Sequence, residues 1–372
     1  MPGNATKLIH GADELIRVPD VAPPINVSTT FAYSDDPSQW VKAADATSIW
    51  GERPIYSRES HPNSELVEQT ISSRVGSYVV AYSSGLSAFN AAITHFNPKV
   101  LAIGHGYHGV TGIADIWTRN HGLKQISLED DFSQLNKGDL VHVETPINPL
   151  GTVYDLETLS RKAHERGAFV LVDATFGPPP LQDPFKHGAD MVMHSATKYF
   201  GGHSDLLAGL LFVKDKKTRD QLVEDRVYLG TNIANLESAL LLRSLKTYEL
   251  RVSKQSQSAT AIVSYLAEHQ KEIPHLKKIY HGSLQKDDFV AKQLVGGHSP
   301  VFAIEVDSEE FAKNLPGKLN YFYHATSLGG VESLIEWRAL SDPTCPTTLL
   351  RVSIGVEDVE DLKQDLFQAL TK

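Results

Sequence analysis

The sequence predicts an α/β fold in which helices cover both faces of a mostly parallel central sheet. Two observations carry this prediction: short apolar runs rich in Val and Ile recur between residues 77 and 213, and segments of helical character separate them. The runs are continuously apolar and do not alternate, which is typical of strands buried on both faces. A chain of 372 residues is long enough for a second, smaller domain.

The expected elements follow this pattern in order along the chain. Residues 1–60 form an arm that looks irregular, because prolines interrupt it at Pro19, Pro23, Pro24, Pro37 and Pro54. Helices are expected at residues 64–74, 85–96 and 156–166. Strands are expected at residues 77–82, 99–103, 125–128, 140–144, 168–173, 191–194 and 210–213.

The remainder of the chain predicts the smaller domain. A long helical pattern begins at Asn235, with leucines on one stripe, and strands are expected at residues 301–306 and 349–354. We therefore divide the chain into an N-terminal arm (1–60), an α/β domain (61–234) and a C-terminal α+β domain (235–372).

Composition narrows the partners and the compartment. A net charge of −10 argues against nucleic acid or an anionic membrane as the main partner. Cys345 is the single cysteine, so no intrachain disulfide and no metal site built on several thiolates can form, and no other metal site is expected. The first 17 residues lack the apolar core of a secretory signal, and no stretch is long and apolar enough to span a membrane. We expect a cytoplasmic protein.

Polar residues follow five of the expected strands, at the edge of the sheet where ligands bind in open α/β folds. The five segments are residues 83–86 (Ser-Ser-Gly-Leu), 104–107 (Gly-His-Gly-Tyr), 145–149 (Thr-Pro-Ile-Asn-Pro), 173–175 (Asp-Ala-Thr) and 195–198 (Ser-Ala-Thr-Lys). Together they supply a phosphate-type loop, an aromatic ring, an amide, a carboxylate, hydroxyls and a lysine.

This set of groups fits pyridoxal 5′-phosphate (PLP). Asp173 can pair with the pyridine nitrogen and keep the ring an electron sink, and Lys198 can form the Schiff base. Gly85 and Leu86 open a helix whose N–H groups can bind the phosphate. Ser195 and Thr197 can add hydroxyl donors, and Tyr107 can stack on the ring.

Each residue alone also has an ordinary structural interpretation. An aspartate that ends a strand is commonly a cap or turn residue, and a lone lysine near a strand end is usually solvated. The PLP interpretation rests on the joint placement of these groups at one edge of the sheet.

The motifs themselves resemble the Cys/Met-metabolism family of PLP enzymes, which includes cystathionine γ-synthases, cystathionine lyases, methionine γ-lyases and O-acetylhomoserine sulfhydrylases. The strongest match is residues 194–199 (His-Ser-Ala-Thr-Lys-Tyr), continuing to Asp205. Other matches are residues 56–58 (Tyr-Ser-Arg), 83–86, 144–149, 172–176, 245–247, 327–334 (Ser-Leu-Gly-Gly-Val-Glu-Ser-Leu) and 351–355 (Arg-Val-Ser-Ile-Gly). They occur in family order and imply PLP fold type I.

The resemblance implies a role for each matching residue. Tyr56 and Arg58 would reach the phosphate of a neighbouring subunit in a homodimer or a dimer of dimers, and Tyr107 would help to protonate the leaving group. Asn148 would lie near O3′ of the ring, while Ser327 and Arg351 would bind the substrate α-carboxylate. For Arg351 the chemistry agrees independently, because a guanidinium matches a carboxylate bidentately.

Departures from the family pattern fall mainly on the substrate side. Residues 107–110 read Tyr-His-Gly-Val in place of the usual Tyr-Gly-Gly-Thr, and Ala174 replaces an asparagine. Residues 61–63 read His-Pro-Asn in place of Asn-Pro-Thr. Thr326 stands where many cystathionine enzymes carry glutamate. Residues 336–348 replace the family's His-Pro-Ala to Met-Thr-His segment.

Three functions stay open on this reading. The first is γ-replacement on an activated homoserine such as an O-acyl ester, with a thiol or another nucleophile. The second is a β- or γ-lyase acting on cystathionine or methionine, which Thr326 mildly disfavours for a standard cystathionine lyase. The third is a non-catalytic PLP-binding relative, which the presence of Lys198, Asp173 and Arg351 weighs against.

Overall fold

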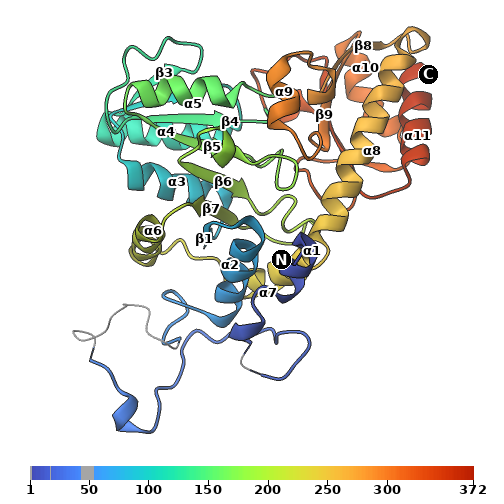
Figure 1. Cartoon of the computed structure of the whole chain (residues 1–372). Helices are drawn as coiled ribbons and strands as arrows, with labels where there is room; N and C mark the ends of the chain where they lie inside the picture. The colour runs from blue at the N-terminus through green and yellow to red at the C-terminus, as the bar shows by residue number, and fades with distance from the viewer. Residues whose placement is uncertain (1, 17, 43–53) are drawn as a thin grey trace.

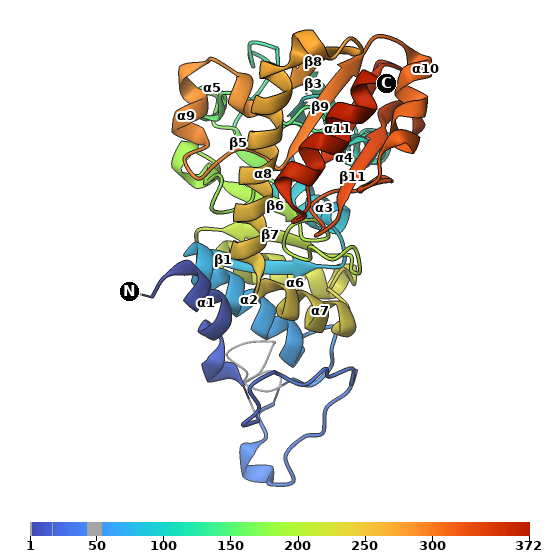
Figure 2. The same cartoon turned by 90° about the vertical axis from the view of Figure 1, so that its right-hand side faces the viewer.

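Two sheets organise the molecule, and a long helix, α8 (Tyr248–Glu268), extends from the core of the first to the core of the second (Figures 1 and 2). The structure is a computed structural model that describes residues 2–16, 18–42 and 54–372. The first sheet and its helices occupy one side of Figure 1, and the second sheet occupies the other. The fold is thus an α/β unit followed by a smaller unit with its own sheet.

The first sheet has seven strands in the order β1-β7-β6-β5-β4-β2-β3. Five of them, β3, β2, β4, β5 and β6, run parallel, and β7 is antiparallel to both of its neighbours. The prediction of a mostly parallel sheet is confirmed, with each boundary within one residue of its expected place. The strands are β1 (Tyr78–Tyr82), β2 (Val100–Ile103), β3 (Lys124–Ser127), β4 (Leu140–Glu144), β5 (Phe169–Asp173), β6 (Met191–Ser195) and β7 (Gly209–Val213).

Helices cover both faces of this sheet because successive strand residues point to opposite sides. On β4, Leu140 packs with α3 (Gly85–Phe96), α4 (His108–His121) and α6 (Lys216–Leu229). Val141 and Val143 pack on the other face with α2 (Pro62–Val75), α5 (Leu156–Glu165) and α7 (Asn235–Leu245). Residues 108–121 and 216–229 were not assigned to helices from the sequence. In α4, Gly109 and Gly112 weaken the helical signal.

The prediction that residues 1–60 are irregular was wrong for one segment. Residues Asn4–His10 form helix α1, which contacts α2. Leu8 is buried in the same core cluster as Leu66 and Ile71. No proline lies within residues 4–10, so nothing breaks the helix, and tertiary packing stabilises it. Later in the arm, residues 18–42 contain one 3₁₀ turn, and Figures 1 and 2 show them projecting from the body.

The second sheet has five strands in the order β10-β11-β12-β9-β8, and α8 and α11 (Val359–Thr371) pack with it in one core. The expected strands at 301–306 and 349–354 occur, whereas the expected long helix divides at Lys246 into α7 and α8. The division of the chain at residues 60 and 234 stays a prediction. The strands and short helices are β8 (Leu276–Tyr280), α9 (Asp288–Gln293), β9 (Val301–Val306), α10 (Glu309–Asn314), β10 (Phe322–His324), β11 (Ser333–Trp337) and β12 (Leu349–Ser353).

Short 3₁₀ helices join several of these elements: η1 (Asp13–Leu15), η2 (Pro37–Gln39), η4 (Pro184–His187), η5 (Gln270–Glu272), η6 (Gly282–Leu284), η7 (Leu315–Lys318) and η8 (Arg338–Leu340). Across residues 2–16, 18–42 and 54–372, none of the helices has both the length and the apolar character that crossing a bilayer requires.

Candidate active site

The N-terminus of α3 lies at the edge of the sheet where β1, β2, β4, β5 and β6 end. The Ser84 hydroxyl caps this helix by accepting the Ser87 N–H at 3.0 Å. A Cβ on Gly85 would lie 3.0 Å from Ser195 Cβ, and one on Gly209 would lie 2.0 Å from Ser84 O. Only glycine fits at position 209, and the tight contact at Gly85 brings the first N–H groups of α3 against the end of β6.

Lys198 occupies the turn that follows β6. Its N–H donates to Ser195 O at 3.2 Å, and its Nζ donates to Ser327 Oγ at 2.9 Å. Burial, followed by the charge of Arg351, lowers the pKa of Lys198 to about 8, although Glu336 opposes this shift. The lysine that the sequence singled out is thus partly buried, held in place and more readily deprotonated than a free lysine.

The turn after Lys198 is braced by a residue that the sequence did not identify. Arg251 on α8 donates from Nη1 to Tyr199 O at 2.8 Å and from Nη2 to Ser244 O at 2.9 Å. A Cβ on Gly202, which has a φ of +69°, would lie 1.8 Å from Arg251 Nη1. Arg251 therefore fixes the path of the chain beyond Lys198, and its spacing in the sequence carried no signal for this contact.

Asp173 lies one strand away, at the end of β5. Its Oδ1 accepts the Thr175 N–H at 2.9 Å and the Thr175 hydroxyl at 2.6 Å, and Thr175 Oγ1 in turn accepts the Ser195 N–H at 2.8 Å. Burial raises the pKa of Asp173, and the Thr175 hydrogen bonds oppose it. A buried carboxylate in this state gains from a cationic partner, which a protonated pyridine nitrogen would be.

The Glu144 carboxylate accepts hydrogen bonds from the backbone of two predicted site residues. Its Oε2 accepts the Tyr107 N–H at 2.7 Å, and its Oε1 accepts the Asn148 N–H at 3.0 Å. Burial, followed by the charge of Asp173, raises the pKa of Glu144 to about 8. The sequence showed Glu144 only as part of a motif, although a carboxylate at the end of an apolar strand was a usable signal.

Tyr107 stands at the N-cap of α4 with 40% of its surface exposed. A Cβ on Gly109 would lie 2.7 Å from the Tyr107 ring and 2.9 Å from the Leu86 side chain. The ring therefore lies beside the N-terminal residues of α3, where the sequence predicted a phosphate site.

The second sheet supplies the arginine of the site. Arg351 is buried in β12, where it donates from Nη1 to Asn148 Oδ1 at 3.0 Å and from Nη2 to Ser327 O at 2.8 Å. Burial lowers the pKa of Arg351 to about 10, and the charge of Glu336 opposes this shift. Arg351 is therefore a buried residue and not a solvated arginine at a strand end. Ser327, which contacts both Arg351 and Lys198, has a φ of +81°, a conformation that non-glycine residues rarely adopt.

A carboxylate that the sequence did not identify faces Arg351. Glu336 on β11 is the cross-strand partner of Arg351, and its Oε2 lies 2.6 Å from Arg351 Nη2. The same Oε2 lies 2.9 Å from Nη1 of Arg338, another buried residue. Both residues belong to the segment that departs from the family pattern, so the sequence offered no template for them.

Three residues that were predicted to bind the phosphate contact other groups within the single chain: Tyr56, Arg58 and Thr197. Arg58 donates to Val227 O at 3.2 Å and lies over the Tyr56 ring at 5.5 Å. Among the described residues, no hydrogen bond or ion pair joins Tyr56 or Arg58 to Lys198, Asp173 or Ser195. The Thr197 hydroxyl donates to Ala208 O at 3.3 Å and accepts the Ala208 N–H at 3.1 Å.

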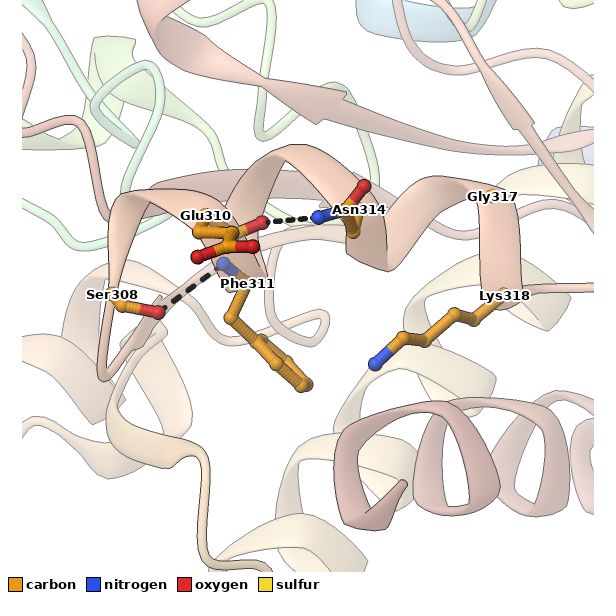
Figure 3. Close-up of a pocket in the computed structure, with 6 residues that line it drawn as sticks. All are labelled: Ser308, Glu310, Phe311, Asn314, Gly317 and Lys318. Carbon is orange, nitrogen blue, oxygen red and sulfur yellow. Dashed lines mark hydrogen bonds between the residues drawn. The ribbon is translucent and has the colours of Figure 1, made fainter.

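A hollow of about 590 Å³ elsewhere on the surface does not include these residues (Figure 3). It lies at α10, where Asn314 donates to Glu310 O at 2.9 Å and Ser308 accepts the Phe311 N–H at 3.2 Å. Its lining consists of Ser308, Glu310, Phe311, Asn314, Gly317 and Lys318. The strand-end group around Lys198 therefore remains the candidate active site.

The residues of this group fit PLP. The cofactor requires a lysine with a lowered pKa, a carboxylate for the pyridine nitrogen and donors for the phosphate. The site has a partly buried lysine with a lowered pKa, a buried Asp173 for which the described residues provide no ion pair, and a helix N-terminus packed on Ser195. Such a site, at the carboxyl edge of an α/β sheet and completed by an arginine from a second sheet, defines the class of PLP-dependent enzymes of fold type I.

Comparison with known proteins agrees with this class and identifies the family. Residues 5–371 match the family described as Cys/Met metabolism PLP-dependent enzyme, so the chain belongs to that family and its cofactor is PLP. Its substrate is a free amino acid, a small molecule.

Individual relatives cover most of the chain. A cystathionine gamma-synthase/O-acetylhomoserine (thiol)-lyase of Bacillus subtilis is 33% identical over 85% of this chain and 85% of its own. A cystathionine beta-lyase of Lactococcus lactis subsp. cremoris is 33% identical over 85% and 88%, respectively. The crystal structure of metB from Corynebacterium glutamicum has a TM-score of 0.87 and 29% identity, and the match covers 100% of this chain and 98% of that one.

Proposed function

We propose that the protein catalyses γ-replacement on an activated homoserine, such as an O-acyl-L-homoserine, with a thiol or another nucleophile. The observation that carries this proposal is that Ser327 contacts both Lys198 and Arg351. Lys198 Nζ lies 2.9 Å from Ser327 Oγ, and Arg351 donates a hydrogen bond to Ser327 O. A base and a carboxylate-binding group thus lie together. The similar protein of Bacillus subtilis is a cystathionine gamma-synthase/O-acetylhomoserine (thiol)-lyase, and that of Lactococcus lactis is a cystathionine beta-lyase.

Binding of the substrate depends on the second sheet. A guanidinium has five N–H donors, more than Arg351 uses in its contacts with Asn148, Ser327 and Glu336, so the α-carboxylate can accept the remaining ones. The same contacts fix the guanidinium plane and the Asn148 amide. The substrate Cα is thereby held near Lys198.

Lys198 moves the protons of the reaction in this proposal. When bound, PLP supplies the electron sink that makes the Cα proton of the substrate removable. The lowered pKa of Lys198 leaves a large share of its amine neutral near pH 8, so that Nζ can take the Cα proton and, once it has given that proton up, take a Cβ proton. Tyr107, half exposed beside Leu86, is placed to donate a proton to the departing γ-group.

Asp173 and the α3 N-terminus hold the cofactor in this proposal. Asp173 pairs with the pyridine nitrogen, and the N–H groups of Gly85 and Leu86, with the hydroxyls of Ser195 and Thr197, bind the phosphate. The Thr175 hydrogen bonds support this, because they connect Asp173 to the Ser195 backbone and so tie the two halves of the cofactor site together.

A β- or γ-lyase acting on cystathionine or methionine is the second candidate, which the Lactococcus relative supports by its name. The purified protein should be given O-acetyl-L-homoserine with and without a thiol. γ-Replacement predicts a new amino acid that forms only with the thiol. Release of ammonia and a keto acid at the same rate in both reactions would identify elimination.

We further propose a cytoplasmic homodimer, or a tetramer of two such dimers, in which Tyr56 and Arg58 bind the phosphate of the neighbour. The exposed side chain of Tyr56, whose backbone pairs with Thr30 of the projecting arm, supports this arrangement. Arg58→Ala should weaken PLP binding about tenfold, the loss of one charge-assisted hydrogen bond. A monomer with full PLP occupancy in sedimentation would contradict the proposal.

A further inference from the structure

The charged cluster around Arg351 contains a second arginine that the reaction as described does not use. Arg338 is buried, and its Nη1 lies 2.9 Å from Glu336 Oε2, the oxygen that Arg351 Nη2 approaches at 2.6 Å. One carboxylate oxygen is thus shared by two guanidinium groups. Ser341 donates to the other oxygen, Oε1, at 2.6 Å, so the Glu336 carboxylate is held from both sides.

This sharing has an electrostatic consequence for substrate binding. Paired with Arg351 alone, a buried Glu336 would neutralise the charge that has to attract a substrate carboxylate. Arg338 supplies an additional positive charge within contact distance of the same oxygen. It thereby weakens the hold of Glu336 on Arg351 without leaving the buried carboxylate unpaired.

Asp342 keeps Arg338 in this position. Its Oδ2 lies 3.5 Å from Arg338 Nη2, and it belongs to the turn that follows η8. Burial raises the pKa of Asp342, but hydrogen bonds from Thr344 and Cys345 and the charge of Arg338 outweigh burial and bring that pKa to about 2. Asp342 is therefore a stable counter-charge for the outer side of Arg338.

We propose that Arg338 is a positioning residue that shares the charge of Glu336 with Arg351, so that Arg351 keeps enough positive charge to bind the α-carboxylate of the amino-acid substrate. Glu336 fixes the edge of the Arg351 guanidinium, and Arg338 sets how much of the Glu336 charge Arg351 has to neutralise. The inference rests on the proposed role of Arg351 and adds a determinant of substrate affinity that lies outside direct contact with the substrate.

The test measures binding of L-alanine to the PLP-loaded protein through the absorbance change of the bound cofactor. L-Alanine has the α-carboxylate and lacks a γ-leaving group. Arg338→Met removes the charge while keeping much of the bulk, and it should weaken binding about tenfold. Arg161→Met, on the exposed face of α5, is the matched control and should bind as the parent does.

A double variant separates an electrostatic role from a merely structural one. In Arg338→Met with Glu336→Gln, Arg351 no longer faces an ionised carboxylate, so binding should return to within about threefold of the parent. Glu336→Gln alone should bind L-alanine more tightly than the parent. A double variant as weak as Arg338→Met, or a single Glu336→Gln variant with weaker binding, would overturn the proposal. If Arg338→Met does not fold, the affinity of Glu336→Gln for L-alanine still tests the proposal.

The pH dependence gives a further readout. With Arg338 absent, Glu336 keeps the raising effect of burial and loses one of the charges that lower its pKa. L-Alanine binding by Arg338→Met should therefore improve relative to the parent as the pH falls, because protonation of Glu336 releases Arg351. An unchanged ratio of the two dissociation constants across the pH range would contradict the proposal.

Arg351→Ala distinguishes failure of this inference from failure of the proposed function. If Arg351→Ala weakens L-alanine binding while Arg338→Met leaves it unchanged, only the role of Arg338 fails. If Arg351→Ala leaves binding unchanged, the assignment of Arg351 to the substrate carboxylate fails first.

Discussion

The two sheets contribute to the candidate site in different ways. At the edge of the first sheet, short loops bring backbone and side chain together, as where Asp173 accepts two hydrogen bonds from Thr175 two residues later. At the second sheet, charged side chains distant in the sequence meet in the interior, as where Arg351 contacts Asn148. The first arrangement follows from local sequence, and the second depends on how the two sheets pack.

The difference bears on which residues can change without loss of the cofactor. The first edge is constrained by a close backbone approach at Gly209, which tolerates no added side chain, and by a tight contact of Gly85 with Ser195. The second sheet is constrained by charge balance, which other sets of residues can satisfy. Its departures from the family pattern, including Arg338, are therefore compatible with an unchanged PLP site.

Replacement of Lys198 should have the largest effect. Lys198→Ala should remove the absorbance of the lysine-bound cofactor and lower turnover about 10³-fold, because both the covalent attachment and the base are lost. Absorbance spectra, borohydride labelling and steady-state kinetics measure this. Lys216→Ala, an exposed residue on α6, is the control. If borohydride labelled another lysine in Lys198→Ala, the assignment of the cofactor to the edge of the first sheet would be wrong.

Arg351→Ala should affect the substrate and spare the cofactor. Loss of its charged hydrogen bonds should lower kcat/KM about tenfold to a few hundredfold. The cofactor spectrum should stay the same, since Asp173 and the α3 N-terminus lie on the first sheet. Arg161→Ala serves as the control. A large loss of PLP occupancy in Arg351→Ala would show that the two regions are not separable.

Gly209→Ala tests the steric constraint of the first sheet. The new Cβ would lie 2.0 Å from Ser84 O, so the backbone at the start of α3 has to move. We expect a loss of about 1–3 kcal/mol in the free energy of unfolding and about tenfold weaker PLP binding. Denaturant unfolding and cofactor titration measure both.

Gly112→Ala is the matched control for this variant. A Cβ at Gly112, within α4, would meet no heavy atom within 4 Å, so the substitution should stabilise the protein by about 0.5–1 kcal/mol. Equal effects of the two alanines on PLP binding would argue against a cofactor role for the close approach at Gly209.

The smallest effect is expected from the charge of Glu336 on Lys198. Because only the neutral amine attacks the aldehyde, the rate at which the apoprotein binds PLP covalently should rise with pH and level off above about 8. The charge of Glu336 raises the pKa of Lys198, so Glu336→Gln should move this midpoint to lower pH. A midpoint shifted upward would show that the second sheet does not act on Lys198 in this way.

Local sequence determined the strands of the first sheet and the residues at their ends. Continuous apolar runs specified buried strands, and the order of the strands along a parallel sheet brought Asp173, Ser195 and Lys198 to one edge. Weak periodicity hid α4, whose glycines lower helical propensity, and α1, which is stabilised by packing of Leu8 against α2.

Tertiary structure alone decided the electrostatics of the site. The lowered pKa of Lys198 depends on burial and on Arg351, and the environment of Arg351 depends on Glu336 across two paired strands. Burial and contact between residues far apart in the chain leave no mark on composition or spacing. The motifs therefore predicted the cofactor and candidate residues to hold it, whereas the packing of the second sheet on the first placed Glu336 and Arg338 around Arg351, the arginine proposed to bind the substrate.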